Sequence, residues 1–527
     1  MFEPKDFEWE SFVEAISTRL FSIEQARSDT HVKYLFGYLG DPEINARSII
    51  VETDYVDGDF LEDFASFYVR CFEPYERFCK RLHFFSMKLS RQDFDALASS
   101  NASSELIADV KKHYLGFIVV KPLPDAIIGR TQLKTYGPDG GRRNYTALVR
   151  YEAHIFGIDL AVESLAFQEQ DRAVAACATV ALWSCFQKTS RLFGTPAPRP
   201  PKITLDATQS IYDQRALPSN GLYVEQICNA IRLNGLDPEV FGQSARERLP
   251  IASLIYAHLK GGLPVLLVVE VEGLEGHALA LSGFSLRDTP QLKIETANPP
   301  KEAPQLVGLR IDEFYAHDDQ HGPFSRLRVL APHKGKPVAF EGSWQHSNGK
   351  KRKLLLRQII IPVYHKIRLN FITVYDRLRR RIHPLVLTAA SITGHDLLEW
   401  DVYLTTTNDY KKAICEERLL NGGRLTQILG SQQPRFFWRC LVRSKGMPLL
   451  EFLIDATSFM RSRAVWRINF LDENFANSFV QVSSVSDDKD LAATIAEEYD
   501  QRNGPRVKEM PEHPLSLDLS LTLEDEN

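Results

Sequence analysis

The sequence predicts an α+β protein in which a central part packs helices on an antiparallel sheet and two flanking parts mix helices and strands. In the central part, helical patterns over residues 171–194 and 219–242 come first, and strand patterns over residues 263–271, 277–285 and 309–319 follow. Helices followed by consecutive strands favour segregated layers over an alternating, doubly wound sheet. The 527 residues also exceed the roughly 250–300 that one hydrophobic core usually covers, so several domains are expected.

Changes in pattern predict three regions. The first, residues 1–130, is an N-terminal α/β region without a recognisable chemical role. The glycine-rich stretch TYGPDGGRRN at residues 135–144 lies near the start of the second region, residues 131–345. The third region, residues 346–527, again mixes strands and helices. In the first region, residues 57–82 show helical spacing of aromatic side chains, and residues 113–124 resemble a buried strand that ends at prolines.

Each element of the central region has its own signal. Residues 144–160 alternate as a hairpin does, and the apolar helix that follows is expected to end near Gly194, because glycine commonly terminates helices. The proline-rich stretch TPAPRPPK, residues 195–202, is expected to be a rigid loop. Ser219 or Asn220 is expected to open the next helix, which is predicted to close at a glycine. In the third region, strand patterns at residues 353–367, 436–444 and 449–459 surround a helical run at 375–394.

Composition narrows the class of protein. The net charge of −5 argues against general coating of nucleic acid. The seven cysteines are odd in number, scattered and without CxxC pairs, which indicates reduced thiols and neither a disulfide framework nor a zinc site. The opening residues MFEPKDFEWE lack the apolar core of a secretory signal, and the longest apolar runs fall well short of the ~20 residues that span a bilayer. A cytoplasmic location without a membrane partner is therefore expected.

A basic segment departs from this acidic balance. Residues 350–381 hold eleven lysines and arginines and a single acid, Asp376, which makes the segment +10. One interpretation is a solvated face that pairs with acidic groups elsewhere in the chain. The other is a docking patch for a nucleic acid, a phosphate or an acidic partner. Only Tyr364, Phe371 and Tyr375 interleave with these charges, so base stacking is poorly supported.

Three positions of the central region carry candidate chemistry. Cys177 lies where the stretch QEQDRAVAACATVALWSCF turns from polar to apolar, at the expected start of a helix. A cysteine there is either ordinary core packing or a thiol whose thiolate is favoured by the helix N-terminus. His277 opens the strand HALALSGF, and Asp318 and Asp319 end the strand RIDEFYAH. Thiol catalysis needs a thiolate, a base and a group that orients the base, and a fold can bring such distant residues together.

The order of these motifs resembles the papain-like cysteine peptidases, nearest the double-glycine leader-peptidase branch. The similarity covers roughly residues 145–330 and runs through Q…D…CAT.ALW, S.GL…QI..A.R..GL, PV.L.V…GHAL.L.GF and a strand that ends in aspartate. It implies Cys177 as nucleophile, His277 as base, Asp318 (less favoured, Asp319) as orienting acid and Gln170 as oxyanion donor, with no metal or cofactor. The spacing from Gln170 to Cys177 is one residue longer than in the family pattern, and Ala178 replaces the family's glycine.

Side-chain alternation along the strand selects between the two aspartates. Successive residues of a strand point to opposite faces, so only one of the pair is expected to face His277. Phe314 and Ala316 are expected to face inward, and Asp318 shares their side. Asp319 is then expected to point away and to cap the following turn. A zinc site built from the Cys177 and His277 pair with an aspartate is the alternative, although no fourth close ligand is evident in the sequence.

The resemblance implies a cytosolic cysteine protease or amide hydrolase that acts on a protein or peptide and is regulated by its flanking regions. By analogy, such an arrangement suits bacterial stress or antiphage defence. Two alternatives stay open. One is a catalytically silent papain-like scaffold that acts as a binding or sensing module, and the other is a transglutaminase-type acyltransferase. The sequence names neither the substrate nor the trigger.

Overall fold

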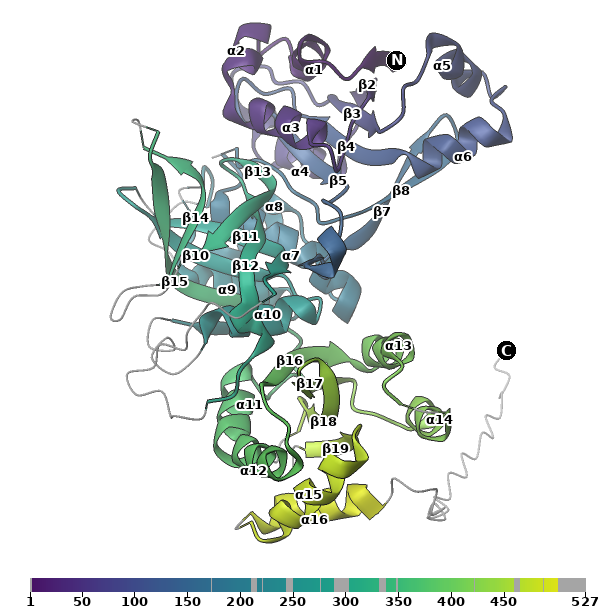
Figure 1. The fold of residues 1–527 in the computed structure, drawn as a ribbon. Helices are drawn as coiled ribbons and strands as arrows, with labels where there is room; N and C mark the ends of the chain where they lie inside the picture. The colour runs from purple at the N-terminus through teal and green to yellow at the C-terminus, as the bar shows by residue number, and fades with distance from the viewer. Residues whose placement is uncertain are drawn as a thin grey trace, which may run out of the picture.

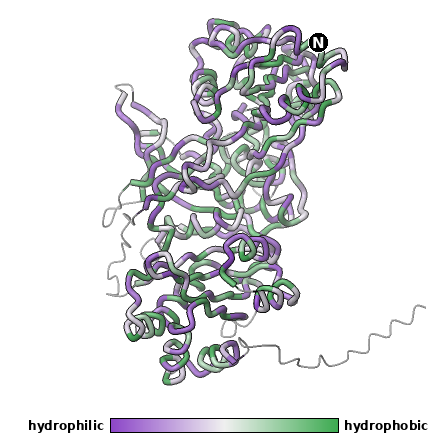
Figure 2. Tube along the Cα trace, turned by 45° about the vertical axis from the view of Figure 1, so that its right-hand side comes forward, coloured by the Kyte–Doolittle hydropathy of each residue, from purple (hydrophilic) through white to green (hydrophobic). Residues whose placement is uncertain are grey.

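The computed structural model describes residues 2–171, 173–209, 216–219, 221–242, 250–274, 276–288, 303–330, 338–346, 349–420, 422–458, 465–486 and 488–500. The chain is a mixed α/β protein with antiparallel sheets, in agreement with the predicted α+β class. Figure 1 shows a sheet with its helices at the top, a central sheet in the middle and a third sheet at the bottom. Hydrophobic segments, green in Figure 2, occur in all three parts of the chain.

The N-terminal sheet has the order β1-β2-β3-β4-β5. Its strands are β1 (Phe2–Asp6), β2 (Ser48–Tyr55), β3 (Cys79–Phe85), β4 (Tyr114–Val120) and β5 (Ile128–Leu133). The helices of this part are α1 (Trp9–Ile16), α2 (Ile23–Ser28), α3 (Thr30–Gly40), α4 (Gly58–Ser66), α5 (Arg91–Ala98) and α6 (Ser104–Lys112). Along β2, Ile49 and Val51 enter the core formed with α1 and α3, whereas Ile50 enters the core on the opposite face. The sheet is therefore covered on both faces, as a continuous apolar run requires.

The central sheet closes on itself. Its path is β10 (Val265–Val271), β11 (Gly276–Leu286), β12 (Ile311–Asp318), β13 (Gly322–Val329), β14 (Ala339–Gln345) and β15 (Lys351–Val363). Because β15 pairs with both β14 and β10, these strands form a closed antiparallel ring, with β9 (Asp237–Phe241) added beside β15 and β6 (Arg143–Asn144) beside β11. The ring thus continues past the boundary predicted at residue 345, because β15 lies beyond it.

Helices pack against this ring. They are α7 (Cys177–Phe193), α8 (Pro200–Thr208), α9 (Val224–Leu233) and α10 (Ile251–Lys260). The helix α7 lies against β10, β11 and β12 and ends at Gly194, whose φ of 72° is left-handed, as predicted for its terminating glycine. The helix α9 is shorter than predicted, because its N-cap is Tyr223 and β9 begins at Asp237. Asn220 lies outside the described residues, and Pro200 opens α8 inside the predicted loop.

A hairpin links the first two sheets. It consists of β7 (Val149–Ile155) and β8 (Ile158–Ser164), joined at Phe156 and Gly157, which both have positive φ. Two positive φ values at a two-residue connection are typical of a type I′ hairpin turn. The hairpin packs its apolar face into the same core as β4 and α6, which confirms the hairpin predicted in this stretch.

The third sheet has the order β16-β17-β18-β19. Its strands are β16 (Leu398–Thr406), β17 (Phe436–Ser444), β18 (Met447–Asp455) and β19 (Val465–Phe470). Around it lie α11 (Phe371–Arg377), a π-helical turn at Leu378–Ile382, α12 (His383–Thr393), α13 (Thr407–Glu417), α14 (Gly422–Gly430), α15 (Glu473–Ser484) and α16 (Lys489–Asp500). One apolar core runs from α7 to Trp400 and Trp438, so the central and C-terminal parts share their interior. No helix among the described residues is long and apolar enough to cross a membrane.

Candidate functional site

Cys177 is the first residue of α7, and the chain that leads into it is held by one carboxylate. Asp171 Oδ1 accepts hydrogen bonds from the backbone N–H groups of Ala173, Val174 and Ala175 at 2.8–3.1 Å. Its other oxygen accepts the hydroxyl of Tyr68, from the N-terminal part, at 3.0 Å. The half-buried Cys177 thiol therefore stands at a fixed helix start, where unpaired N–H groups favour a negative charge.

His277 is the partner of this thiol. It is the second residue of β11, opposite Val269 of β10, and its side chain is buried. The Cys177 side chain lies close enough to His277 to raise the pKa of the imidazole. The ring atom Nε2 of His277 lies 3.0 Å from Asp318 Oδ1 at the end of β12. The predicted nucleophile, base and orienting acid are thus brought together from three elements that are far apart in the sequence.

The carboxylate of Asp318 is held on both oxygens. Besides His277, Oδ1 accepts the backbone N–H of Gln320 at 3.1 Å. Trp344 donates its indole N–H to Oδ2 at 2.8 Å, and His321 Nδ1 lies 3.2 Å from the same oxygen. The Trp344 ring also packs against the His277 imidazole, with 5.1 Å between centroids. Sequence reasoning missed both Trp344 and His321, although HDDQHGPF places a second histidine beside the acid pair.

The prediction that Asp319 points away from His277 is wrong. Its Oδ1 lies 3.6 Å from His277 Nε2, so both carboxylates lie beside the imidazole instead of on opposite faces. The pairing of β12 with β13 shifts register between Ala316 and Asp318, and the strand ends there, so the two-residue alternation does not extend to Asp319. Nor does the Asp319 carboxylate cap the turn, because neither of its buried oxygens has a hydrogen-bond partner among the described residues.

Mutual charge sets the protonation of this cluster. Burial lowers the pKa of His277, but the adjacent carboxylates and the hydrogen bonds to Asp318 and Cys177 raise it more, so the pKa lies well above its ordinary value. Burial opposes ionisation of Asp318, yet His277 and His321 hold the pKa of that carboxyl well below its usual range. Burial raises the pKa of Asp319 to about 6. The imidazole is thus held as a cation between one firm and one weak carboxylate.

The N-terminal part reaches the same cluster through α3. His31 Nε2 lies 2.9 Å from the backbone carbonyl of Asp319, and its Nδ1 lies 3.4 Å from Glu169 Oε1. The hydroxyl of Tyr34, also on α3, donates to the carbonyl of Pro323, the second residue of β13, at 2.6 Å. The turn after β12 is therefore fixed by a region that the resemblance does not cover.

His317, the other imidazole near the aspartates, has a structural position. Its Nε2 donates to the Leu165 carbonyl at 2.9 Å, and its Nδ1 accepts the N–H of Phe324 at 3.2 Å. Burial lowers its pKa to about 4, which keeps the ring neutral. Gln170, predicted to be the oxyanion donor, is half-buried before Asp171, and its side chain has no hydrogen bond within the described part of the chain.

The same cluster has the composition of a cation site. One ligand atom each from His277, Asp318 and Asp319 lies within 4.8 Å of the others. Imidazole and carboxylate are ligands of divalent cations such as Zn²⁺, and the unpartnered Asp319 carboxylate has free lone pairs to offer. The spacing in sequence does not predict this group, because Asp319 was expected to point away.

The basic segment at residues 350–381 divides between β15 and the helical stretch from α11 to α12. On β15, Arg357 pairs with Glu270 and Lys351 with Glu341. In the helical stretch, Arg379 and Arg380 pair with Asp376, and Arg381 pairs with Asp488. Much of the segment therefore pairs within the chain. No protein-family model and no curated protein matches the sequence, so the candidate site stands on its geometry.

Proposed function

We propose that the protein is a papain-like cysteine hydrolase that cleaves an amide bond in a protein or peptide. The observation that carries this proposal is the chain of contacts from the Cys177 thiol to His277 and from His277 Nε2 to Asp318. A helix packed on an antiparallel sheet, with the thiol on the helix and the base and acid on adjacent strands, is the arrangement that the resemblance implies.

In this proposal, the Cys177 thiol gives its proton to His277, and the sulfur attacks the carbonyl carbon of the scissile bond, whose C–N bond breaks; water then releases the acyl group from the sulfur. The two N–H groups of the His277 cation then allow proton transfer to the leaving amine while Nε2 stays bonded to Asp318. Trp344 packs against the imidazole and donates its indole N–H to Asp318, which fixes the carboxylate. The backbone N–H of Cys177 and Gln170 are the proposed donors to the oxyanion, worth about 3–4 kcal/mol per donor.

The flanking regions are proposed to regulate this site from a cytoplasmic location, in a stress or antiphage response. The contacts of His31 and Tyr34 with the turn after β12 support such control, because movement of α3 would change the position of Asp319. An acyl transfer to an amine, instead of water, uses the same residues. A catalytically silent scaffold predicts normal folding but no dependence of any product on Cys177.

Alkylation by iodoacetamide tests the thiol directly. Cys415 is exposed and would react for trivial reasons, so Cys415→Ser is the starting protein, and the half-buried Cys71 serves as the internal reference. We expect Cys177 to react at least tenfold faster than Cys71 at pH 6, and His277→Ala to remove that advantage. Equal rates at the two cysteines in a folded protein would reject the proposal.

Comparison of newly formed protein termini in cells that carry the wild type or Cys177→Ala tests the reaction. Hydrolysis predicts termini that appear only with the wild type. New cross-links to amines in place of termini would indicate acyl transfer, and identical proteomes would indicate a scaffold.

A divalent cation at His277, Asp318 and Asp319 is the second candidate, favoured by the unpartnered Asp319 carboxylate. Metal analysis of the purified protein separates it from thiol chemistry. Stoichiometric zinc that is lost in Asp319→Ala but kept in Cys177→Ala supports the cation. Absence of bound metal in the wild type, with a fast Cys177, supports the thiol.

A further inference from the structure

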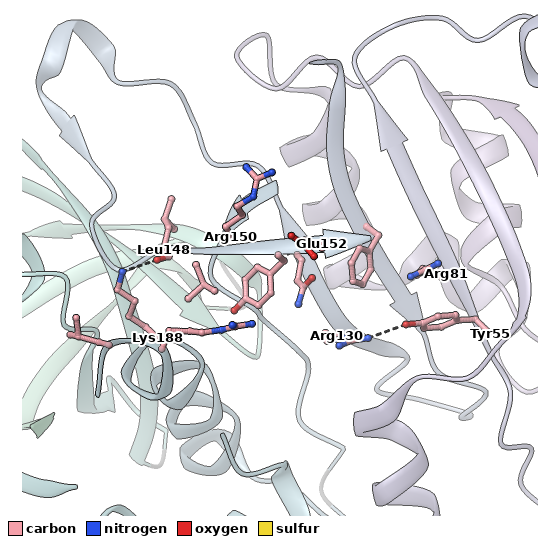
Figure 3. A pocket seen from close by; sticks show the side chains of 13 residues that line it. Tyr55, Arg81, Arg130, Leu148, Arg150, Glu152 and Lys188 are labelled. Atoms are coloured by element: carbon pink, nitrogen blue, oxygen red, sulfur yellow. Dashed lines mark hydrogen bonds between the residues drawn. The ribbon is translucent and has the colours of Figure 1, made fainter. Parts of the chain in front are cut away.

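A second site lies where the N-terminal sheet, the β7 strand and α7 meet. The cavity there has a volume of about 740 Å³, within the range of roughly 300–1,000 Å³ typical of small-molecule sites. Its walls come from β2, β3, β4 and β5 on one side and from β7 and α7 on the other (Figure 3). We call it the α7–β7 pocket.

The charge of the α7–β7 pocket is strongly positive. Five cationic side chains line it, against one acid, Glu152. Arg81 and Arg130 are neutralised by Glu52 and Asp57, at 2.6 and 2.7 Å. Arg150 and Glu152, two residues apart, share the exposed face of β7, and Figure 3 shows Arg150 pointing away from Lys188. The cations left over for a ligand are the two on α7.

Those two are Lys188 and Arg191. Among the described residues, neither has a carboxylate within ion-pair distance, and the ammonium of Lys188 donates only to the carbonyl of Leu148, at 2.8 Å (Figure 3). One helical turn separates them, so their side chains lie on one face of α7. Two uncompensated positive charges in a partly enclosed pocket match a dianion, such as a phosphate monoester.

The inner end of the pocket offers polar recognition and aromatic surface. The side chain of Gln132 is 3 % exposed, lines the pocket and has no hydrogen bond within the described chain. Arg130 Nε is also buried without a hydrogen-bond partner there. The amide atoms of Gln132 are not among the fully buried atoms that lack a partner, so a ligand or water in the pocket can reach and bond them. The rings of Tyr55, Phe117 and Tyr151 line the same space, which suits a planar ring with hydrogen-bonding edges.

We propose that the α7–β7 pocket binds a small phosphorylated ligand with a planar heterocycle, of the nucleoside monophosphate class. Lys188 and Arg191 hold the phosphate, and the Gln132 amide pairs with the edge of the ring. A small molecule fits better than a polymer, because the unpartnered amide is buried inside the pocket. Cys177 lies eleven residues earlier on α7, about 16 Å along the axis, so this site is separate and does not rest on the proposed hydrolase.

Calorimetric titration of the full-length protein at low salt tests the proposal with AMP, adenosine, ribose 5-phosphate and inorganic phosphate. We expect AMP to bind at least tenfold more tightly than each of the other three. The double variant Lys188→Met/Arg191→Met should weaken AMP at least tenfold. Its matched control is Lys33→Met/Arg232→Met, which also removes two exposed or partly exposed positive charges, one of them a lysine bonded to a carbonyl. That control should bind AMP as the wild type does.

Gln132→Leu separates ring recognition from charge. It should bring AMP within threefold of ribose 5-phosphate while leaving ribose 5-phosphate binding unchanged. No binding of AMP to the folded wild type, or equal loss in the control double variant, would overturn the proposal. Tighter binding of a single-stranded oligonucleotide than of AMP, abolished by the same Lys188 and Arg191 changes, would overturn it in favour of a polymer.

Discussion

Two buried clusters in this protein each pair a cationic side chain with carboxylates. They differ in how completely the carboxylates are hydrogen-bonded. In the C-terminal sheet, Arg439 and Glu451 face each other from β17 and β18, both about 1 % exposed. Glu451 also accepts the hydroxyl of Tyr410 at 2.7 Å and the amide of Asn469 at 2.8 Å, and Arg439 reaches Glu417 with two nitrogens. Each of the four central side chains there has partners.

The cluster at the end of β12 is different. Asp318 has four hydrogen-bond partners, but among the described residues neither buried oxygen of the adjacent Asp319 has a hydrogen-bond partner. The carboxylates of Asp318 and Asp319 lie side by side, and the His277 imidazolium forms an ion pair with each of them. An ionic network in which every polar atom is hydrogen-bonded stabilises the fold. Buried polar atoms without a hydrogen-bond partner can still bind a ligand or a substrate, and such atoms are typical of functional sites. This contrast in hydrogen bonding supports the proposal that the cluster at the end of β12 is the reactive one.

The largest expected effect is on turnover at Asp318. Asp318→Ala should lower turnover of a peptide substrate by roughly 10⁴-fold, as loss of the orienting carboxylate does in triads, whereas Asp318→Asn keeps more of it. The matched control is Asp319→Ala, one residue away and equally buried, with an expected loss below tenfold. Equal, large losses from both changes in folded proteins would show that the carboxylates act as a unit.

The structural cluster should respond in stability. Arg439→Met leaves buried Glu451 without its cation, which should cost about 3–5 kcal/mol. Hydrogen exchange of β17 and β18 peptides under rising urea measures this locally, since a chain with several sheets need not unfold in one step. Cys177 alkylation should not change. A loss below 1 kcal/mol would mean that the network is no more than packing.

Loss of the Asp319 charge should increase the free energy of unfolding near neutral pH, whereas loss of a paired buried charge usually decreases it. Its pKa of about 6 lies above the ordinary value of 3.8 for an aspartate, so between these pH values the folded state binds more protons than the unfolded state. The contribution of this group to stability therefore falls as pH rises from about 4 to 6, by on the order of 3 kcal/mol. Asp319→Asn removes that loss, so the variant should gain on the wild type between pH 4 and pH 7. A pH-independent difference in unfolding free energy contradicts this prediction.

The smallest expected effect is at an exposed ion pair. Arg381 and Asp488 lie 2.8 Å apart, but the Arg381 side chain is 58 % exposed. Arg381→Met should change the unfolding free energy by less than about 1 kcal/mol, and the change should vanish in high salt. A loss comparable to that of Arg439→Met would show that exposure does not distinguish the two kinds of pair.

Local signals in the sequence determined much of this molecule. Strand patterns and Gly194 located the hairpin, the strands β10, β11, β12 and β15 of the ring and the end of α7, because these depend on nearest neighbours and on glycine's freedom at positive φ. They did not locate β13 and β14. Residue order also placed Cys177 at a helix start and His277 and Asp318 on adjacent strands. Whether these residues perform thiol chemistry stays a prediction.

Tertiary structure alone decided the rest. The pairing of β15 with β10, which closes the ring across the predicted boundary, is a contact between distant strands. The register shift before Asp318 broke the alternation and turned Asp319 toward His277, and only the partner strand imposes that shift. The contact of Trp344 with Asp318, the contact of His31 with Asp319 and the α7–β7 pocket all depend on elements that are far apart in the sequence and meet only in the fold. Sequence periodicity specifies the face of one element, but the identity of the element opposite that face is set by long-range packing.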